Sequence, residues 1–172
     1  MPTQDTITLT RAAADFGRIE ELLDLILRAF ASMDGVIDPP SSAHRLTPQS
    51  LRDKCAAEIA IVALRGERPV GCVFLAERAD HVYLGKLAVD PACQGKGLGG
   101  LLMREAETVA IAAGKPLIEL QTRVELTANQ ATFAKLGFVE TGRSSLLCLA
   151  RNAEVEHIDT QLSQSAWKAR KP

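Results

Sequence analysis

The sequence predicts an α/β fold with a single domain, in which helices cover both faces of a mixed central sheet. Three observations lead to this prediction. The apolar run Val82–Val89 is followed by four glycines within six residues and then by an amphipathic helical pattern. Two further apolar runs come before it in the sequence. Only short turns separate the three runs, which indicates an antiparallel meander. A fourth run, Leu117–Thr122, follows the helical pattern, so it should lie parallel to its predecessor.

Length and composition limit the class of protein. The 172 residues suffice for one domain with a core, and 20 basic against 21 acidic residues give a net charge of −1. Bulk electrostatics therefore favour neither a nucleic acid nor a membrane as partner, and we see neither a signal peptide nor a membrane-spanning run. Four widely spaced cysteines without a CxxC pair predict reduced thiols in a cytoplasmic protein. Three histidines without ligand spacing predict no metal site.

The residues up to 57 predict one strand and two helices. Thr6–Thr10 alternates threonine with apolar residues, as a half-buried strand does. Asp15 is the expected cap of a helix that runs to about Phe30, because apolar residues recur there at three- and four-residue spacing. Residues 33–48 predict a loop long enough to line a binding site, and Leu51–Ala57 predicts a second short helix.

Three strands are expected in close succession after these helices. Ile59–Leu64 is continuously apolar, the turn Gly66–Pro69 reverses the chain, and Val70–Ala76 returns beside the first strand. A second turn leads into His81–Val89. This strand should end at Pro91, because proline has no N–H to donate to the sheet.

The helix after the glycines should bury one apolar face. Its apolar positions recur with helical spacing, whereas charged residues lie largely off that face. The apolar members are Leu98, Leu101, Leu102, Ala106 and Val109, and the charged members are Arg104, Glu105 and Glu107. The segment Gly114–Pro116 predicts its C-terminal cap and stop.

The last third of the chain predicts one more helix and at least one strand. Residues 127–130 have the T-x-x-Q form of a capping box, and they predict a short helix that ends at Leu136 before a glycine. Val139–Ala150 predicts the strand that follows. The expected domain therefore spans residues 6–150, with one further strand within 154–162 as an option and a polar tail at 163–172.

The glycine-rich stretch between strand and helix has the properties of an anion site. Glycines let the backbone approach a ligand closely, and the first N–H groups of the helix have no partner within it. The helix dipole adds partial positive charge at that end, so a phosphate or pyrophosphate is the expected guest. The structural alternative is a turn that only connects the strand to the helix.

Two other phosphate-binding motifs fit this stretch less well. A Walker A loop needs Ser or Thr directly after Gly-Lys, whereas Gly97 follows Lys96 here. Gly95, Gly97 and Gly100 match the G-x-G-x-x-G of a dinucleotide-binding fold, and Glu119 lies roughly 20 residues further on. That motif belongs to the first turn of a parallel αβ series, whereas half of this chain precedes the loop.

The stretch 94–99, Gln-Gly-Lys-Gly-Leu-Gly, follows a strand of the type Leu-Ala-Val-x-Pro. It resembles the Q/R-x-x-G-x-G/A motif of the GCN5-related N-acetyltransferase (GNAT) family. The resemblance implies the GNAT fold, with a parallel splayed pair of strands after the meander, and acetyl-CoA as cosubstrate. It implies that loop amides bind the pyrophosphate and that the preceding strand binds the pantetheine arm and the acetyl carbonyl. The residues so implied are Leu87, Ala88, Val89, Gln94, Gly95, Lys96, Gly97, Leu98, Gly99 and Gly100.

Residues 122–143 carry a second resemblance, to the N-x-x-(F/Y)-Y-x-x-x-G-F segment of the same family. It implies that Asn129 and Phe133 also belong to the cofactor site, with Asn129 bonded to the pantetheine arm. The family often has tyrosine at the position of Phe133, where its hydroxyl protonates the leaving thiolate. Phenylalanine has no proton to give, so this role is not carried over. The local alternatives are an asparagine that bonds nearby backbone and a ring packed in the core.

The resemblance implies direct attack of a primary amine on the acetyl thioester. This reaction needs a base and an oxyanion donor, which is expected from the backbone N–H near Leu87 or Val89. Tyr83 and Glu119 are the candidate catalytic bases, because each lies on one of the two parallel strands. The structural alternatives are a packed ring with a solvated hydroxyl and a surface acid. Lys96 is the candidate partner of a cofactor phosphate.

The sequence does not identify the acceptor. Asp34 and Asp38, in the loop 33–48, would attract a cationic amine. The expected partner is a small-molecule amine, and a homodimer stays an option. The alternative function is a non-catalytic CoA-binding sensor or regulatory module on the same fold, which Phe133 favours. A dinucleotide-dependent oxidoreductase is the third hypothesis.

Overall fold

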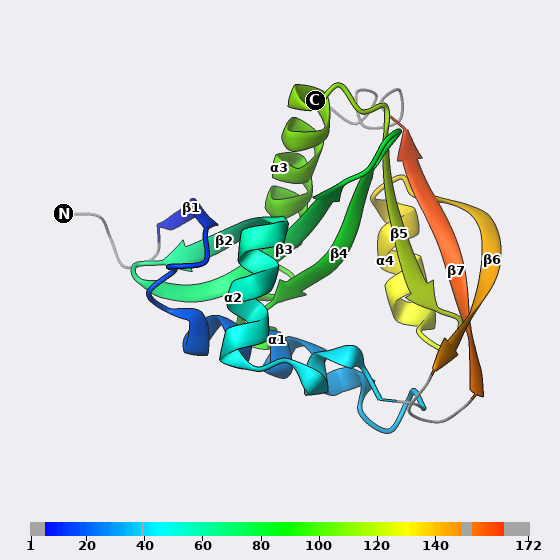
Figure 1. The fold of residues 1–172 in the computed structure, drawn as a ribbon, viewed down its shortest axis with the longest axis horizontal. Helices are drawn as coiled ribbons and strands as arrows, with labels where there is room; N and C mark the ends of the chain where they lie inside the picture. Colours follow the sequence, from blue (N-terminus) through cyan, green and yellow to red (C-terminus); the bar gives the residue numbers. More distant parts are fainter. Residues whose placement is uncertain (1–5, 39, 149–152, 164–172) are drawn as a thin grey trace. The chain divides into compact units, whose positions relative to one another are not determined.

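The computed structural model describes residues 6–38, 40–148 and 153–163 (Figure 1). Within these residues seven strands are hydrogen-bonded in the order β1-β2-β3-β4-β5-β7-β6. The sheet is mixed and carries helices between its strands, which confirms the predicted α/β class. The strands are β1 (Ile7–Ala12), β2 (Ile59–Arg65), β3 (Arg68–Glu77), β4 (Val82–Val89), β5 (Leu117–Arg123), β6 (Val139–Cys148) and β7 (Ala153–Ser163). The helices are α1 (Ile19–Phe30), α2 (Pro48–Ala57), α3 (Leu98–Ala112) and α4 (Thr127–Lys135), with short 3₁₀ turns η1 (Ala31–Met33), η2 (Ser42–Arg45) and η3 (Pro91–Cys93).

The described residues form two compact units, and the division between them passes through β4 and α3. The first unit takes its residues from Met1–Ser32, Ser42–Ala76 and Leu84–Ala106. The second takes its residues from Met33–Ser41, Glu77–Tyr83 and Glu107–Pro172. Each unit thus contains chain segments from both sides of the glycine-rich stretch.

The first unit contains the predicted meander. β1 pairs antiparallel with β2, and β2 pairs antiparallel with β3, with one irregularity between Ala63 and Leu64. β4 is the next neighbour of β3, and the connection between them is too short for a parallel crossover. The strand ends where the Asp90 N–H donates to the Val70 carbonyl at 2.9 Å, directly before Pro91. The end at Pro91 is therefore confirmed.

Helices cover both faces of the sheet in the first unit. On one face α1 and α2 bury a core with the strands; this core is built from Ala12, Ile19, Leu22, Leu25, Ile26, Ala43, Leu51, Cys55, Ala60, Val62, Cys72, Phe74 and Ala88. On the other face, the first turns of α3 lie against β3, because a Cβ placed on Gly71 would lie 3.1 Å from Leu102 and 3.2 Å from Leu98. The central strand β3 is buried on both faces, which explains its continuous apolar run.

The second unit contains the parallel pair and the C-terminal strands. β4 pairs parallel with β5 at two positions, Val82 with Ile118 and Tyr83 with Glu119. This pairing confirms the predicted parallel relation. The relation arises because a helix lies between the two strands in the chain. β5 pairs antiparallel with β7, and β7 with β6. The optional last strand is confirmed as β7.

Two helix starts differ from the sequence prediction. α1 begins at Ile19 and not directly after Asp15; Arg18 is its N-cap and makes no capping bond. α4 begins at Thr127 with Leu126 as N-cap, so the predicted capping box is wrong. Gln130, the box's expected glutamine, instead donates through Nε2 to the carbonyls of residues 123 and 124 at 3.2 and 2.9 Å.

The second helix also begins earlier than predicted. α2 starts at Pro48, three residues before Leu51, because Thr47 and Ser50 form a reciprocal capping box. The Ser50 N–H donates to Thr47 Oγ1 at 3.1 Å, and the Thr47 N–H donates to Ser50 Oγ at 2.9 Å. Pro48 occupies the first helical position, where its missing N–H costs nothing.

The buried face of α3 is broader than the apolar pattern predicted. Glu107 was expected largely off this face, but it is only 6% exposed, so that prediction is wrong. Met103 and Ala110 are fully buried and were not predicted, whereas Leu101 is half-buried. The predicted C-terminal cap is confirmed, since Gly114 has φ +70° and the Lys115 N–H donates to the Ala110 carbonyl at 2.9 Å.

Parts of two predictions fall outside the described residues. These are the last two residues of the strand expected at Val139–Ala150 and the polar tail beyond Ser163. Among the helices that the structure describes, none combines the length and the apolar content needed to cross a bilayer.

Cys72 on β3 gives the core a testable dependence on pH. Burial is the main reason that the pKa of this fully buried thiol rises from 9.0 to about 12, against the opposing effects of the Lys86 charge and the Ala88 N–H. An unfolded chain releases this proton from about pH 9 upward. The folded chain keeps it to about pH 12, so the stability falls as the pH rises between these values.

We therefore expect the wild type to lose up to about 1.4 kcal/mol of unfolding free energy per pH unit more than Cys72→Ala does between pH 9 and 11. Urea unfolding in the presence of a reductant measures both slopes. Equal slopes in the two proteins would contradict the assignment to Cys72.

Candidate active site

The glycine-rich stretch forms a compact, exposed loop in the first unit. After β4 the chain makes the turn η3, and the Gln94 Nε2 donates back to the Val89 carbonyl at 3.3 Å. Gly95 and Gly97 have φ values of +75° and +81°, a conformation that other residues adopt only with strain. Residues 94–97 are all exposed, so the backbone of the loop is accessible.

The loop has room for a phosphate beside unpaired amides. A Cβ placed on Gly95, Gly97 or Gly99 would meet no atom within 4 Å. The first hydrogen bond of α3 runs from the Leu101 N–H to the Gly97 carbonyl at 3.0 Å. The amides of the first helical turn, from Leu98 to Gly100, therefore have no partner within the helix. A diphosphate fits this combination of open space, orphan donors and helix dipole.

A buried carboxylate holds the start of this loop. Asp90 is 4% exposed, and its Oδ1 accepts from the Ala92 N–H at 2.9 Å. Its Oδ2 accepts from Arg28 Nη2 at 3.1 Å and from Arg68 Nη2 at 3.2 Å. Burial opposes ionisation, but the Ala92 N–H and the two arginines outweigh it and hold the pKa of Asp90 below its ordinary value. Sequence reasoning missed Asp90, because its partner Arg28 lies 62 residues away.

We expect Asp90→Asn to raise the KM for acetyl-CoA, the cosubstrate expected from the sequence, about tenfold. The variant loses the ion pairs that hold the start of the loop in place, which weakens binding by about 1.4 kcal/mol. The lowered pKa means that this stabilisation is present above about pH 4 and is lost as the pH falls further. Initial-rate kinetics measure KM. The matched control is Asp80→Asn, which removes an exposed carboxylate paired with His81. Equal KM values in both variants would contradict a positioning role for Asp90.

Gly71 is a second residue that sequence reasoning missed. It lies on β3, where the side chains of Leu98 and Leu102 at the start of α3 contact the backbone. The Ala88 carbonyl lies 3.4 Å from the place of its absent Cβ. A glycine here allows the close approach of α3 to the sheet, and this contact fixes the helix end that follows the loop.

The strand before the loop presents backbone and not side chains. Ala88 belongs to the buried core, whereas Leu87 and Val89 are half-buried. Within the first unit the sheet ends at β4, so one edge of Leu84–Val89 is an outer edge of that unit. An extended ligand arm can bond to such an edge through its amide groups.

Both candidate bases lie in the second unit, next to each other. Tyr83 and Glu119 are register partners in the parallel pair of β4 and β5, so their side chains leave the same face of the sheet. Glu119 Oε2 accepts from Gln161 Nε2 at 3.0 Å, and Gln161 is its partner on β7. Both side chains are half-buried. Gln161 was not predicted, since a cross-strand partner depends on the register between distant segments.

The two residues of the second motif lie on α4 and are half-buried. The Phe133 ring packs against Phe138 edge to face, with 5.6 Å between the centroids. The Phe138 N–H also donates to the Phe133 carbonyl at 3.1 Å, and Gly137, the glycine expected after the helix, has φ +98°, the left-handed conformation of a C-terminal cap. Asn129 lies one helical turn before Phe133, on the same side of α4.

The loop expected to line the acceptor site is tied to β5 in the second unit. Arg123 Nη2 donates to the Asp38 carbonyl at 3.0 Å and to Glu125 Oε1 at 3.1 Å. The hydrogen bond from Arg123 is the main cause that lowers the pKa of Glu125. Asp34 and Asp38 are exposed. Residues 33–41 of this loop and both candidate bases therefore belong to one unit.

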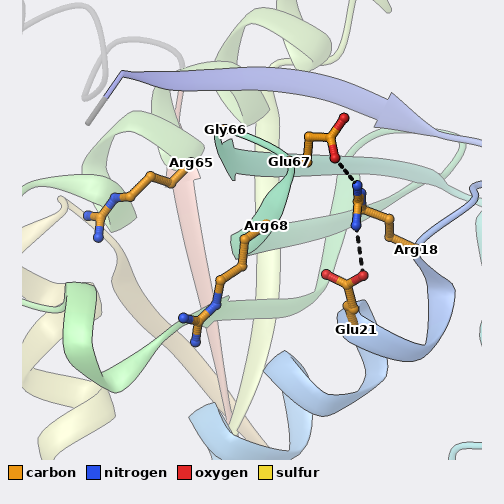
Figure 2. A pocket seen from close by; sticks show the side chains of 6 residues that line it. All are labelled: Arg18, Glu21, Arg65, Gly66, Glu67 and Arg68. Carbon is orange, nitrogen blue, oxygen red and sulfur yellow. Dashed lines mark hydrogen bonds and ion pairs between the residues drawn. The ribbon is translucent and has the colours of Figure 1, made fainter. Parts of the chain in front are cut away.

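An open cavity of about 470 Å³ lies at the β2–β3 turn of the first unit (Figure 2). It is lined by Arg18, Glu21, Arg65, Gly66, Glu67 and Arg68. Arg18 bonds to Glu21 at 2.8 Å and also to Glu67, as Figure 2 shows, so its charge is neutralised by the chain itself. The Arg68 side chain points away from this pair, as Figure 2 shows, and its Nη2 donates to Asp90 at 3.2 Å, which links the turn to the start of the glycine-rich loop.

The described residues hold no group of three or more His, Cys, Asp or Glu side chains that would bind a metal ion. Cys55, Cys72 and Cys93 are free and buried. Burial is also the main cause that raises the pKa of Cys55.

Comparisons with known proteins agree with the fold and identify the family. The model of the "Acetyltransferase (GNAT) family" matches residues 19–138. The structure superposes on the PaiA N-acetyltransferase of Thermoplasma acidophilum in complex with coenzyme A, with a TM-score of 0.74 at 14% identity over 92% of this chain and 99% of the other. A GNAT acetyltransferase of Elizabethkingia anophelis with bound acetyl-CoA gives a TM-score of 0.65 at 18% identity, with 92% and 99% of the two chains covered.

A curated relative matches only part of the chain. The mycothiol acetyltransferase of Rhodococcus jostii is 38% identical over 74 residues, which are 43% of this chain and 22% of the relative. The match thus spans about a fifth of the length of that relative.

Proposed function

Since the chain belongs to the acetyltransferase (GNAT) family, we propose that it moves an acetyl group from acetyl-CoA to a primary amine by direct attack in a ternary complex. The observation that carries this proposal is the loop at residues 94–100. It combines two glycines of positive φ, open space above them and the unpaired amides of α3. A turn that only connects a strand to a helix does not need these features, whereas a diphosphate site does.

The residues proposed to hold acetyl-CoA fall into three groups. The amides of Gln94–Gly100 and the Lys96 ammonium bind the pyrophosphate, and the exposed edge of β4 from Leu87 to Val89 bonds the pantetheine arm. Ala88 contributes only backbone groups, because its side chain is part of the core. Asn129 bonds the arm from α4, and Phe133 contributes its ring. Acetyl-CoA supplies the activated thioester.

The chemistry then needs the acceptor as a free amine. We propose that Glu119 takes a proton from the acceptor nitrogen, because it is the carboxylate that lies beside Tyr83 in the parallel pair. The free amine forms a bond to the acetyl carbon, the carbon–sulfur bond breaks, and CoA leaves as the thiolate, while the nitrogen releases its second proton to water. Tyr83, the register partner of Glu119, bonds the acceptor through its hydroxyl. The backbone N–H near Leu87 stabilises the oxyanion.

The leaving thiolate has no tyrosine to protonate it. Phe133 occupies that position and packs against Phe138. A thiolate of ordinary pKa leaves at little cost near neutral pH, so the reaction does not require this acid. The same observation favours the alternative function, a CoA-binding sensor that binds acetyl-CoA without turnover.

A thiol-release assay with acetyl-CoA and a panel of amines separates these two functions. Release of CoA that depends on the amine supports the enzyme, and binding without release supports the sensor. The panel should include amino acids, aminated sugars, polyamines and the acceptor of mycothiol acetyltransferases. That acceptor enters only as a panel member, because the match covers 22% of such a relative. We propose a cytoplasmic protein and no nucleic-acid or membrane partner, and size-exclusion chromatography decides whether it forms a homodimer.

A further inference from the structure

Lys86 lies on β4 directly before Leu87, and none of the described carboxylates forms an ion pair with it. Alternation along the strand places it on the face opposite to Tyr83 and Leu87. Its Nζ lies 5.6 Å from the centroid of the Phe30 ring, at the end of α1. The side chain is half-buried.

The groups that face Lys86 leave one positive charge in excess. From α2, Lys54 and Glu58 act on it, and Lys54 Nζ is bonded to Glu58 Oε1 at 2.7 Å and lies 5.4 Å from the Phe74 ring centroid. From β3 the neutral Cys72 thiol faces it. Glu58 is thus already engaged by Lys54. Burial, followed by the like charge of Lys54, lowers the pKa of Lys86.

A second atom in this cluster also lacks a partner. Glu58 Oε2 is buried, and no hydrogen-bond donor among the described residues reaches it. The cluster therefore offers an ammonium without an ion pair, which can bind an anion, and a carboxylate oxygen that can accept from an O–H or N–H of the same ligand. Burying a charge or a polar atom in this way costs free energy unless a ligand compensates it.

We infer that the acceptor carries an anionic group, a carboxylate or a phosphate, and that Lys86 binds it. The inference rests on the proposed function, because Lys86 is the neighbour in sequence of Leu87, whose N–H is proposed to hold the acetyl carbonyl. Because Leu84–Val89 is an outer edge of the first unit, an acceptor can hold its anionic group beside Lys86 while its amine lies on the Tyr83 face of the same edge. This residue would then select acceptors by charge and would take no part in bond making.

Pairs of acceptors that differ only in the anion test the inference. Amino acids are compared with their C-terminal amides, and glucosamine 6-phosphate with glucosamine, so that the carboxylate and phosphate arms are separate. In the wild type we expect kcat/KM for the anionic member of one pair to exceed that of its neutral partner at least about tenfold, as one charge-assisted contact allows. In Lys86→Met the ratio should fall to about one through the acceptor KM, with the acetyl-CoA KM unchanged.

Two further variants serve as controls. Lys86→Arg keeps the charge and should keep most of the preference. Lys135→Met removes an exposed charge at the end of α4 and should behave as the wild type. A wild type that prefers neutral acceptors or cationic ones, or a preference that survives Lys86→Met, overturns the inference.

A structural role for Lys86 is tested by stability. If its contact with Phe30 only stabilises the fold, Lys86→Met lowers the melting temperature. If Lys86 instead serves to bind an anion, its ammonium is buried at a desolvation cost in the free protein. Methionine removes this cost, and the melting temperature rises by about 2–4 °C. Anionic members of the panel should then raise the melting temperature of the wild type and not that of Lys86→Met.

The same melting-temperature measurements distinguish failure of the inference from failure of the proposed function. If acetyl-CoA gives no thermal shift, the proposed function is wrong. If acetyl-CoA binds but no amine is acetylated, the melting temperature of the acetyl-CoA complex is measured with each panel member. A shift by the anionic members that depends on Lys86 supports the inference, and its absence overturns the inference alone.

Discussion

Replacement of Gly97 by glutamate should abolish useful binding of acetyl-CoA. Gly97 has φ +81° in the exposed loop, where a Cβ meets no atom within 4 Å, so the new side chain fits but projects over the loop. Its carboxylate would repel the pyrophosphate by about 3 kcal/mol at the separation of neighbouring groups. We therefore expect the affinity to fall at least about 100-fold, measured by isothermal titration.

A matched glycine controls for backbone strain. Gly114 has φ +70°, is exposed, and also has no atom within 4 Å of the place of its Cβ. It caps the C-terminal end of α3, so Gly114→Glu introduces the same strain and charge away from the loop. That variant should bind acetyl-CoA as the wild type does. Normal binding by Gly97→Glu, or equal losses in both variants, would show that the loop does not bind the phosphates.

Replacement of Glu119 by glutamine should lower kcat about 100-fold, because the variant cannot accept the proton of the acceptor amine. Glutamine has the same shape and can still bond to Gln161, so the sheet should stay intact. Tyr83→Phe should lower kcat about tenfold by removing one hydrogen bond to the acceptor. The measurement is kcat against pH with the best amine of the panel.

The pH profile separates a base from a structural acid. In the wild type kcat should fall at low pH, because a general base acts only in its deprotonated form, and this limb of the profile should disappear in Glu119→Gln. Glu140→Gln is the control, since Glu140 is an exposed acid on β6 that pairs with Arg143 at 3.0 Å. An unchanged kcat in both Glu119→Gln and Tyr83→Phe would mean that solvent or another group deprotonates the acceptor.

Local patterns in the sequence predicted the loop and most of the sheet. The strand, the stop at Pro91 and the glycines lie within one short stretch, and each acts through its own backbone conformation. The alternation and the short turns likewise predicted the meander. These features need no knowledge of distant residues, and the structure confirms them.

The helix starts were harder to predict, because side chains near a helix end have competing partners. Arg18 occupies the cap of α1 but bonds to Glu21 and Glu67, and Glu67 lies on the β2–β3 turn. Gln130 satisfies carbonyls at the end of β5 and does not cap α4. A capping motif predicts which residues are able to cap a helix, and the tertiary structure decides which of them do.

The residues that position the site were missed because their roles depend on distant contacts. Asp90 acquires its role from Arg28 and Arg68, 62 and 22 residues away. Gly71 acquires its role from the side chains of α3, and the role proposed for Lys86 depends on its neighbours from α1 and α2. A charged residue in an apolar strand, as Lys86 is in β4, is the one signal in the sequence that indicates such a site.

A thermal-shift titration with acetyl-CoA tests the central claim most directly. At a concentration 100 times its Kd, a ligand of the folded state adds about 2.7 kcal/mol of stability. For a chain of this size we therefore expect the melting temperature to rise by about 5–10 °C, with no rise for NADH at the same concentration. No shift with acetyl-CoA, or an equal shift with NADH, would contradict the assignment of the loop to CoA.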